Sequence, residues 1–168
     1  SSVTAMVLAG ARVSVTFTVG NSQGEVITSH AVTCNSSEGG ASRTATGTGS
    51  PILVTALTPA KTYTCAATST NAVGESAASS VTSPFSSGYP VILSSFTGSG
   101  TVSDTSGQMS CDTSCSTTEV ANQAITLTAT PASGWAFSSW GGACSGSQST
   151  CSIFMSQSRE VSASFVLA

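Results

Sequence analysis

Short runs of alternating apolar residues, separated by turn residues, constrain the fold of this chain more than any other feature. Segment 12–19 sets Val, Val, Phe and Val at every second position between Ser and Thr residues, and segments 125–129 and 161–165 repeat the pattern. A period of two puts alternate side chains on opposite faces of a strand, and clusters of Gly, Asn, Ser and Pro mark the turns between runs. The sequence therefore predicts an all-β protein, and regularly spaced short strands favour β-sandwiches.

Charged residues are scarce, and the few basic ones are scattered. They make up 7% of the chain, with a net charge of −3 at pH 7, and the four basic residues are Arg12, Arg43, Lys61 and Arg159. Nucleic-acid binding and polybasic membrane binding both need clustered Lys and Arg. No apolar run approaches the ~20 residues of a spanning helix. We therefore expect no nucleic-acid partner and no membrane insertion.

Six cysteines in a helix-poor, Ser- and Thr-rich chain indicate disulfides formed in an oxidising compartment. The alternative is zinc, which needs two close ligand pairs. Cys111 and Cys115 make one such pair, but Cys144 and Cys151 are too widely spaced for a second, and His30 lies far away. We therefore predict disulfides, no metal and no other cofactor, in an extracellular or cell-surface protein. Because the chain begins with Ser rather than Met, we expect a processed or excised segment.

The first half of the chain carries a specific corner motif. Leu57-x-Pro59-x-x-x-Tyr63 resembles the corner before strand F of a fibronectin type III domain, where a Tyr hydroxyl bonds back to nearby backbone. Segment 63–74 resembles strand F and the turn after it, and segment 27–34 resembles strand C. Residues 1–83 thus resemble a fibronectin type III domain, which implies a two-sheet sandwich. The turn residues at 71–74 predict a last strand near 76–82.

The resemblance also implies one disulfide. Strands C and F are neighbours in that fold, and Cys34 and Cys65 lie on their inward faces, so these two cysteines are expected to bond. His30, on the same face as Cys34, is either a metal ligand or pH switch, or a buried replacement for an aromatic residue. We favour the replacement, since no second His or carboxylate cluster accompanies it.

The second half carries a different pattern. Residues 84–90 contain two prolines and little periodicity, so we predict a linker there, between domains at 1–83 and 91–168. Segment 127–165 contains Leu-x-Ala-x-Pro-x-x-Gly, Phe-x-x-Trp, Cys-x-Gly, Cys, Met and Val-x-Ala-x-Phe in that order. This run resembles the divergent bacterial repeat related to internalin B repeats, which implies a bacterial source and a small β domain.

The apolar residues of that domain are few for its size, so we expect disulfide bonds to stabilise it. Six cysteines permit many pairings, and sequence alone does not choose among them. We favour Cys111–Cys115 and Cys144–Cys151, because each of these bridges stays within one motif of the repeat. The complete fold prediction is a fibronectin type III-like sandwich followed by a small disulfide-stapled β domain.

No catalytic constellation is predicted. The seven acidic residues are far apart in sequence, and His30, which a Ser-His-Asp triad would require, lies on a predicted core face. Two functions remain. The first is a non-catalytic structural or adhesive protein, either a stalk segment of a surface protein or a filament subunit. Its partners would be other copies or neighbouring domains, and the apolar segments 3–8 and 161–167 would pair with their strand edges.

The alternative is a carbohydrate-binding accessory module of a secreted polysaccharide-degrading enzyme. It would need an exposed aromatic strip, with Trp135 beside Tyr89 or Phe154, to stack on sugar rings. The competing interpretation is that such aromatic residues fill the core. Trp135 is evenly balanced between the two, and Phe154 alternates away from its apolar neighbours.

Overall fold

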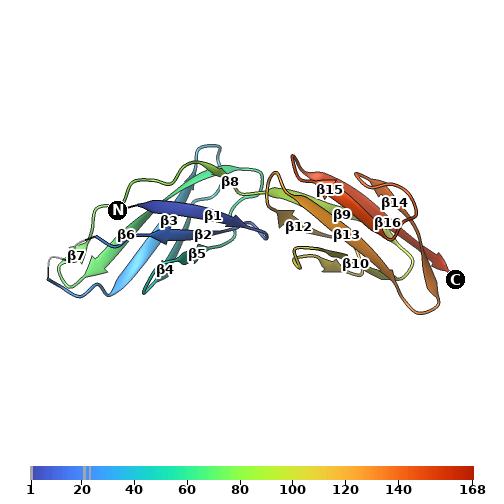
Figure 1. Ribbon diagram of the computed structural model, residues 1–168, viewed down its shortest axis with the longest axis horizontal. Helices are drawn as coiled ribbons and strands as arrows, with labels where there is room; N and C mark the ends of the chain where they lie inside the picture. Colours follow the sequence, from blue (N-terminus) through green and yellow to red (C-terminus); the bar gives the residue numbers. More distant parts are fainter. Residues whose placement is uncertain (1, 21, 23) are drawn as a thin grey trace. The chain divides into compact units, whose positions relative to one another are not determined.

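The structure is a computed structural model that describes residues 2–20, 22 and 24–168. It is all-β, as predicted. The chain forms two compact units, Ser1–Ser87 (unit 1) and Gly88–Ala168 (unit 2), which Figure 1 colours from blue to green and from green to red. The described residues form no helix long and apolar enough to cross a bilayer.

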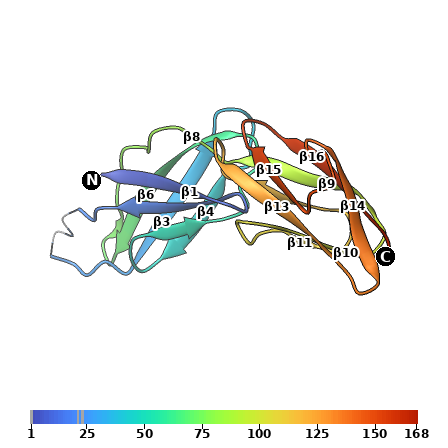
Figure 2. The same ribbon diagram turned by 45° about the vertical axis from the view of Figure 1, so that its right-hand side comes forward.

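Unit 1 is a sandwich of two sheets. Sheet A has the strand order β1 (Val3–Leu8), β2 (Arg12–Phe17), β5 (Ile52–Val54). Sheet B has the order β4 (Arg43–Gly47), β3 (Ser29–Ser36), β6 (Thr62–Asn71), β7 (Gly74–Glu75), and β8 (Phe85–Ser86) also pairs with β6. The hairpin of β1 and β2 lies across β3 and β6 in both views (Figure 1, Figure 2).

The core of unit 1 follows the predicted alternation. In β2 the apolar positions are buried and the Ser and Thr positions between them are half-buried or exposed. The inward side chains of both sheets form one cluster. Its fully buried members are Val13, Val15, Val32, Cys34, Val54, Tyr63 and Cys65.

The last strand predicted at 76–82 is instead an irregular segment tied to β6 through hydroxyl groups. Its anchors are Ser76, Ser79 and Thr82, three residues apart. Each donates its backbone N–H to a carbonyl of β6 and accepts, at its hydroxyl oxygen, the N–H of that same β6 residue, over 2.8–3.1 Å. The β6 partners are Ser69, Ala67 and Cys65. Because three residues of the segment span two residues of β6, a regular backbone ladder cannot form.

Unit 2 is also a sandwich, with four strands in each sheet. Sheet C has the order β12 (Cys115–Glu119), β9 (Tyr89–Thr97), β16 (Arg159–Leu167), β14 (Trp135–Gly142). Sheet D has the order β11 (Ser110–Cys111), β10 (Gly100–Asp104), β13 (Ala124–Pro131), β15 (Thr150–Phe154). Within sheet C, β16 runs parallel to β9 and antiparallel to β14.

The core of unit 2 lies between these sheets. Its fully buried members are Val91, Leu93, Val102, Met109, Leu127, Met155 and Val161. Gly98 allows two strands to close on this core, since a Cβ there would clash with the Phe165 carbonyl oxygen and lie 2.7 Å from the Trp135 ring. Its φ of +81° also favours glycine.

Residues 84–90, predicted as a linker, include the end of unit 1 and the start of unit 2, and parts of this segment lie in strands. Phe85 pairs with Tyr63 across β8 and β6, and β9 begins at Tyr89. Beyond β8, the Ser87 side chain takes part in the pairing: its hydroxyl donates to the Thr58 carbonyl and accepts the Lys61 N–H. Sequence patterning missed these pairings because the bonds depend on side-chain oxygens and distant partners rather than on periodicity.

Candidate functional site

The disulfide of unit 1 joins two central strands of sheet B. Cys34 lies directly opposite Cys65 in the antiparallel register of β3 and β6, with 4.0 Å between the Cα atoms. Both side chains are fully buried on the inward face. Closing a loop with 31 residues of separation stabilises the fold by about 3–4 kcal/mol on the chain-entropy model.

The two disulfides of unit 2 close the two open sides of its sandwich. On one side, Cys111 of the sheet D edge strand bonds Cys115 of the sheet C edge strand. On the other, Cys144, which follows the edge strand β14, bonds Cys151 of the edge strand β15. Each short loop contributes roughly 2–2.5 kcal/mol on the same model. Both pairs are those favoured from the sequence, and with Cys34–Cys65 they account for all six cysteines.

The predicted corner motif forms in unit 1. The Tyr63 hydroxyl accepts the Thr58 N–H over 3.0 Å and donates to the Ala41 carbonyl over 2.9 Å. His30 is buried with its ring centroid 5.0 Å from that of Phe17, and its Nδ1 lies 2.8 Å from the Ser69 hydroxyl. No group of three or more metal-ligating side chains occurs among the residues that the structure describes. His30 thus occupies a core position between a ring and a hydroxyl.

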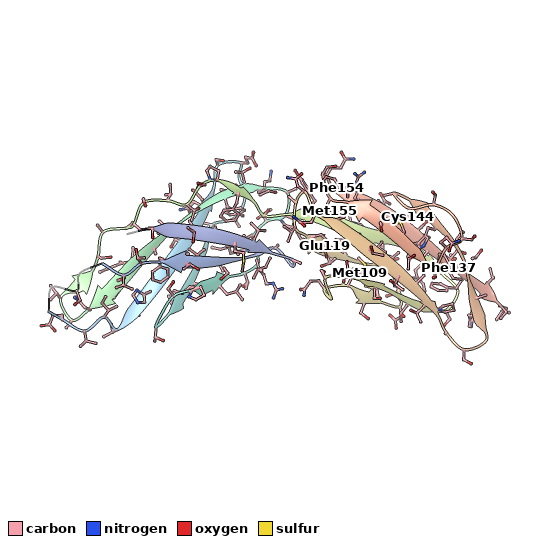
Figure 3. All side chains as sticks on the ribbon, viewed as in Figure 1. Met109, Glu119, Phe137, Cys144, Phe154 and Met155 are labelled. Carbon is pink, nitrogen blue, oxygen red and sulfur yellow. A yellow bond between two sulfur atoms is a disulfide. The ribbon has the colours of Figure 1, made fainter. Side chains whose placement is uncertain are left out.

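The three aromatic residues predicted as possible ligand contacts are not brought together. Tyr89 begins β9 and Trp135 begins β14, at opposite ends of sheet C. Arg159 of β16 lies opposite Val91, two residues beyond Tyr89, and Leu167 lies opposite Trp135, so the two aromatic residues are about ten residue levels apart, roughly 33 Å along the strand. Phe154 lies on sheet D, and Figure 3 shows it at the opposite end of unit 2 from Phe137, two residues along β14 from Trp135.

Burial explains why these aromatic residues do not line up. Tyr89 and Trp135 are half-buried and pack against the core of unit 2. Phe154 is 53% exposed, on the outer face of β15. The coplanar strip on which the carbohydrate-binding alternative depends is therefore absent among these three residues.

A pair of carboxyl groups that sequence reasoning missed joins the two sheets of unit 2. Asp104 ends β10 of sheet D, and Glu119 ends β12 of sheet C. The Ser106 hydroxyl lies 2.6 Å from Asp104 Oδ2 and 3.0 Å from Glu119 Oε1. Asp104 Oδ1 also accepts the N–H groups of Gln108 and Met109, over 3.0 and 3.1 Å. The pair lies on the same side of the sandwich as Cys111–Cys115.

The pKa of Glu119 is raised and the pKa of Asp104 is lowered, so the pair retains one proton below about pH 7. Glu119 is 2% exposed, and burial, the hydrogen bond with Asp104 and the charge of Asp104 together raise the pKa of Glu119 to about 7. Burial also raises the pKa of Asp104, but hydrogen bonds from Glu119, Ser106 and two backbone N–H groups outweigh it and lower that pKa overall. Glu119 therefore keeps its proton at acidic pH and donates it to the Asp104 carboxylate.

Strand parity is the signal from which the inward orientation of Glu119 could have been predicted. Cys115 faces the sheet D strands to form its disulfide, so residues two and four positions further along β12 face the same way. Glu119 is the fourth. Its partner Asp104 lies 15 residues earlier and on the other sheet, so strand parity does not predict that the two side chains meet.

Grooves in the described part of unit 1 include two without a reactive cluster among their described lining residues. The larger, of about 360 Å³, lies beside the hydroxyl-bonded segment and is lined mostly by backbone, methyl and hydroxyl groups, with Glu75 at its rim. The smaller, of about 280 Å³, lies between β1 and residues Ser83, Pro84 and Phe85. Asp104 and Glu119 line neither groove.

Comparison with known proteins finds that the second half of the chain is similar to a described domain type. The family model of the divergent InlB B-repeat domain matches residues 95–168, nearly all of unit 2. No curated protein matches the chain.

Solved structures with a similar course of the chain include one described as a myokine. It is 18% identical, with a TM-score of 0.41, over 50% of this chain and 89% of that one. Another is the chicken CNTN1 FN1–FN3 domains, 14% identical with a TM-score of 0.46, over 95% of this chain and 53% of that one. This chain thus spans about half the length of the CNTN1 structure.

Proposed function

We propose that this protein is a non-catalytic structural module of a bacterial cell exterior, either a stalk segment of a surface protein or a subunit of an extracellular filament, with adhesion as its role. The observation that carries the proposal is the covalent closure of both open sides of unit 2. Two disulfides there join the edge strands of the two sheets, and a third crosses sheet B of unit 1. Thin cores with covalent staples suit a protein that must keep its shape outside the cell.

The match of residues 95–168 to a divergent InlB B-repeat supports the bacterial source and the non-catalytic role. The Tyr63 corner and the direct opposition of Cys34 and Cys65 support a fibronectin type III-type module in unit 1. The Ser- and Thr-rich, charge-poor composition supports association through neutral strand edges, since few charges oppose it.

Localisation and assembly of the native protein test this proposal. Thiol labelling without reductant, immunogold electron microscopy of intact cells, and sedimentation of the released protein are the measurements. We expect no labelled thiol, gold at the cell surface, and particles larger than one chain. Labelled cysteines in a protein confined to the cell interior would contradict the proposal. Retention on chitin, cellulose or starch that is lost in Trp135→Ala would instead support the carbohydrate-binding alternative.

A further inference from the structure

β1 has one backbone edge that no strand of sheet A pairs with, and residues 83–85 flank this edge across a groove without joining the sheet. β1 pairs with β2 on one side only and ends the strand order of sheet A. All six of its residues pair in regular register, without a bulge. It contains no charged residue and no proline, which are the usual devices that prevent edge-to-edge pairing.

Hydrogen-bond parity shows which backbone groups point outward. The Thr18 N–H donates to the Ser2 carbonyl over 3.1 Å, so Ser2 and Thr18 are a hydrogen-bonded pair. Bonded and non-bonded pairs alternate along an antiparallel ladder. The N–H and C=O groups of Val3, Ala5 and Val7 therefore point away from β2. On the far side, a groove of about 280 Å³ separates β1 from residues 83–85, and no described strand pairs there.

The other edges in the described part of the chain are shorter or protected. The edge of β6 is covered by the hydroxyl-bonded segment 76–82 and by β7 and β8. β4 carries Arg43, β12 ends in Glu119, and the pairing of β14 is interrupted by an irregularity after Phe137. β5, β11 and β15 have three, two and five residues. β1 is therefore the edge best suited to pair with another strand.

We propose that two copies of this chain associate by antiparallel pairing of their β1 strands. This inference rests on the proposed assembly of the protein and names the surface through which copies meet. The outward residues Val3, Ala5 and Val7 are symmetric about Ala5. A two-fold axis there places Val3 of one copy opposite Val7 of the other and Ala5 opposite Ala5, so every outward N–H and C=O finds a partner.

The side chains suit the same register. On the inner face it pairs Val with Val and Ala with Ala, and β-branched cross-strand pairs are favourable. On the outer face it places Thr4 opposite Met6, and Met6 is 61% exposed in the single chain. No like charges meet, because β1 carries none. The result is a continuous six-stranded sheet made of two copies of sheet A.

Sedimentation of the full chain and two variants tests the edge. Met6→Lys places a charge on β1, and Leu53→Lys places the same charge on the same outer face of sheet A but on β5, at its other edge. We expect a concentration-dependent dimer in the unaltered chain, a dissociation constant raised by about tenfold or more in Met6→Lys, and no change in Leu53→Lys. Circular dichroism verifies that both variants fold.

Cysteine cross-linking tests the register. Thr4→Cys and Met6→Cys, mixed under mild oxidation, should give a disulfide-linked heterodimer, because opposite residues of a non-bonded pair lie about 4.5 Å apart at Cα. Thr4→Cys mixed with Leu53→Cys should not.

Larger particles that persist unchanged in Met6→Lys, with no selective cross-link, would overturn the β1 proposal and leave assembly through another surface. A strictly monomeric unaltered chain at high concentration would overturn both the β1 proposal and the filament form of the proposed function. Immunogold labelling of intact cells would then still test whether the protein is a stalk segment of a surface protein.

Discussion

Replacing Glu119 by Gln should remove a pH dependence from the stability of unit 2. Glutamine keeps the size of the side chain, an oxygen to accept from Ser106 and an N–H group to donate to Asp104, but it cannot ionise. In the unaltered protein the folded unit holds the Glu119 proton up to about pH 7, whereas the unfolded chain releases it near 4.5. The free energy of unfolding should therefore fall as pH rises from 4.5 to 7.

The size of this effect follows from the two pKa values. Moving the pKa of a carboxyl from 4.5 to about 7 corresponds to roughly 3 kcal/mol between the protonation states. Asp104 acts in the opposite direction, because its pKa is lowered on folding. Its contribution is present above pH 3.8 and is lost as pH falls below that value. Unit 2 should therefore be most stable near pH 4.

Tryptophan fluorescence isolates unit 2, since both tryptophans of the chain, Trp135 and Trp140, lie within it. Urea unfolding from pH 4 to 8 should show a slope in the unaltered protein and in Glu160→Gln, which alters an exposed glutamate of the same unit. Glu119→Gln should match the unaltered protein at pH 4 and exceed it by roughly 3 kcal/mol at pH 8. Equal stability of the unaltered protein at pH 4.5 and 7.5, or an unchanged slope in Glu119→Gln, would refute the shared proton.

Two further substitutions test local packing. Gly98→Ala should destabilise unit 2 by about 3 kcal/mol or more, because the added Cβ meets backbone and the Trp135 ring. The control Gly134→Ala has a similar φ of +78° but open space around the added Cβ, so it should destabilise unit 2 by only about 1–2 kcal/mol. Equal losses of stability in urea unfolding would contradict the close approach at Gly98. Tyr63→Phe should cost roughly 2–3 kcal/mol, since it leaves the Thr58 N–H and the Ala41 carbonyl without their partner, and a loss below about 0.5 kcal/mol by circular dichroism would argue against the corner.

Much of the fold could be predicted from the sequence because side chains in β strands alternate with a period of two. Alternation predicted the inward residues of β2, β3 and β13. Together with the family resemblance, it placed Cys34 and Cys65 on facing positions. The side on which a residue lies is a local property of the strand, and local patterning therefore predicts it.

Features that depend on side-chain hydrogen bonds were missed. Segment 76–82 has an unremarkable composition, and its hydroxyls replace backbone acceptors only because β6 presents N–H groups at the matching positions. The Asp104–Glu119 pair likewise exists only when two sheets close on each other. Neither residue signals its partner, since their separation in sequence carries no period.

The position of a strand within its sheet is a third kind of information, and the two apolar segments proposed for edge pairing illustrate it. Both 3–8 and 161–167 alternate, and periodicity treats them alike. In the structure β16 lies between β9 and β14, so the backbone groups of residues 161–164 are used on both sides, and residues 165–167 pair with β14 alone. β1 has one neighbour and retains the outward groups of Val3, Ala5 and Val7. Alternation assigns faces, while strand order, which arises from distant pairing, determines which backbone groups are left to bind another copy.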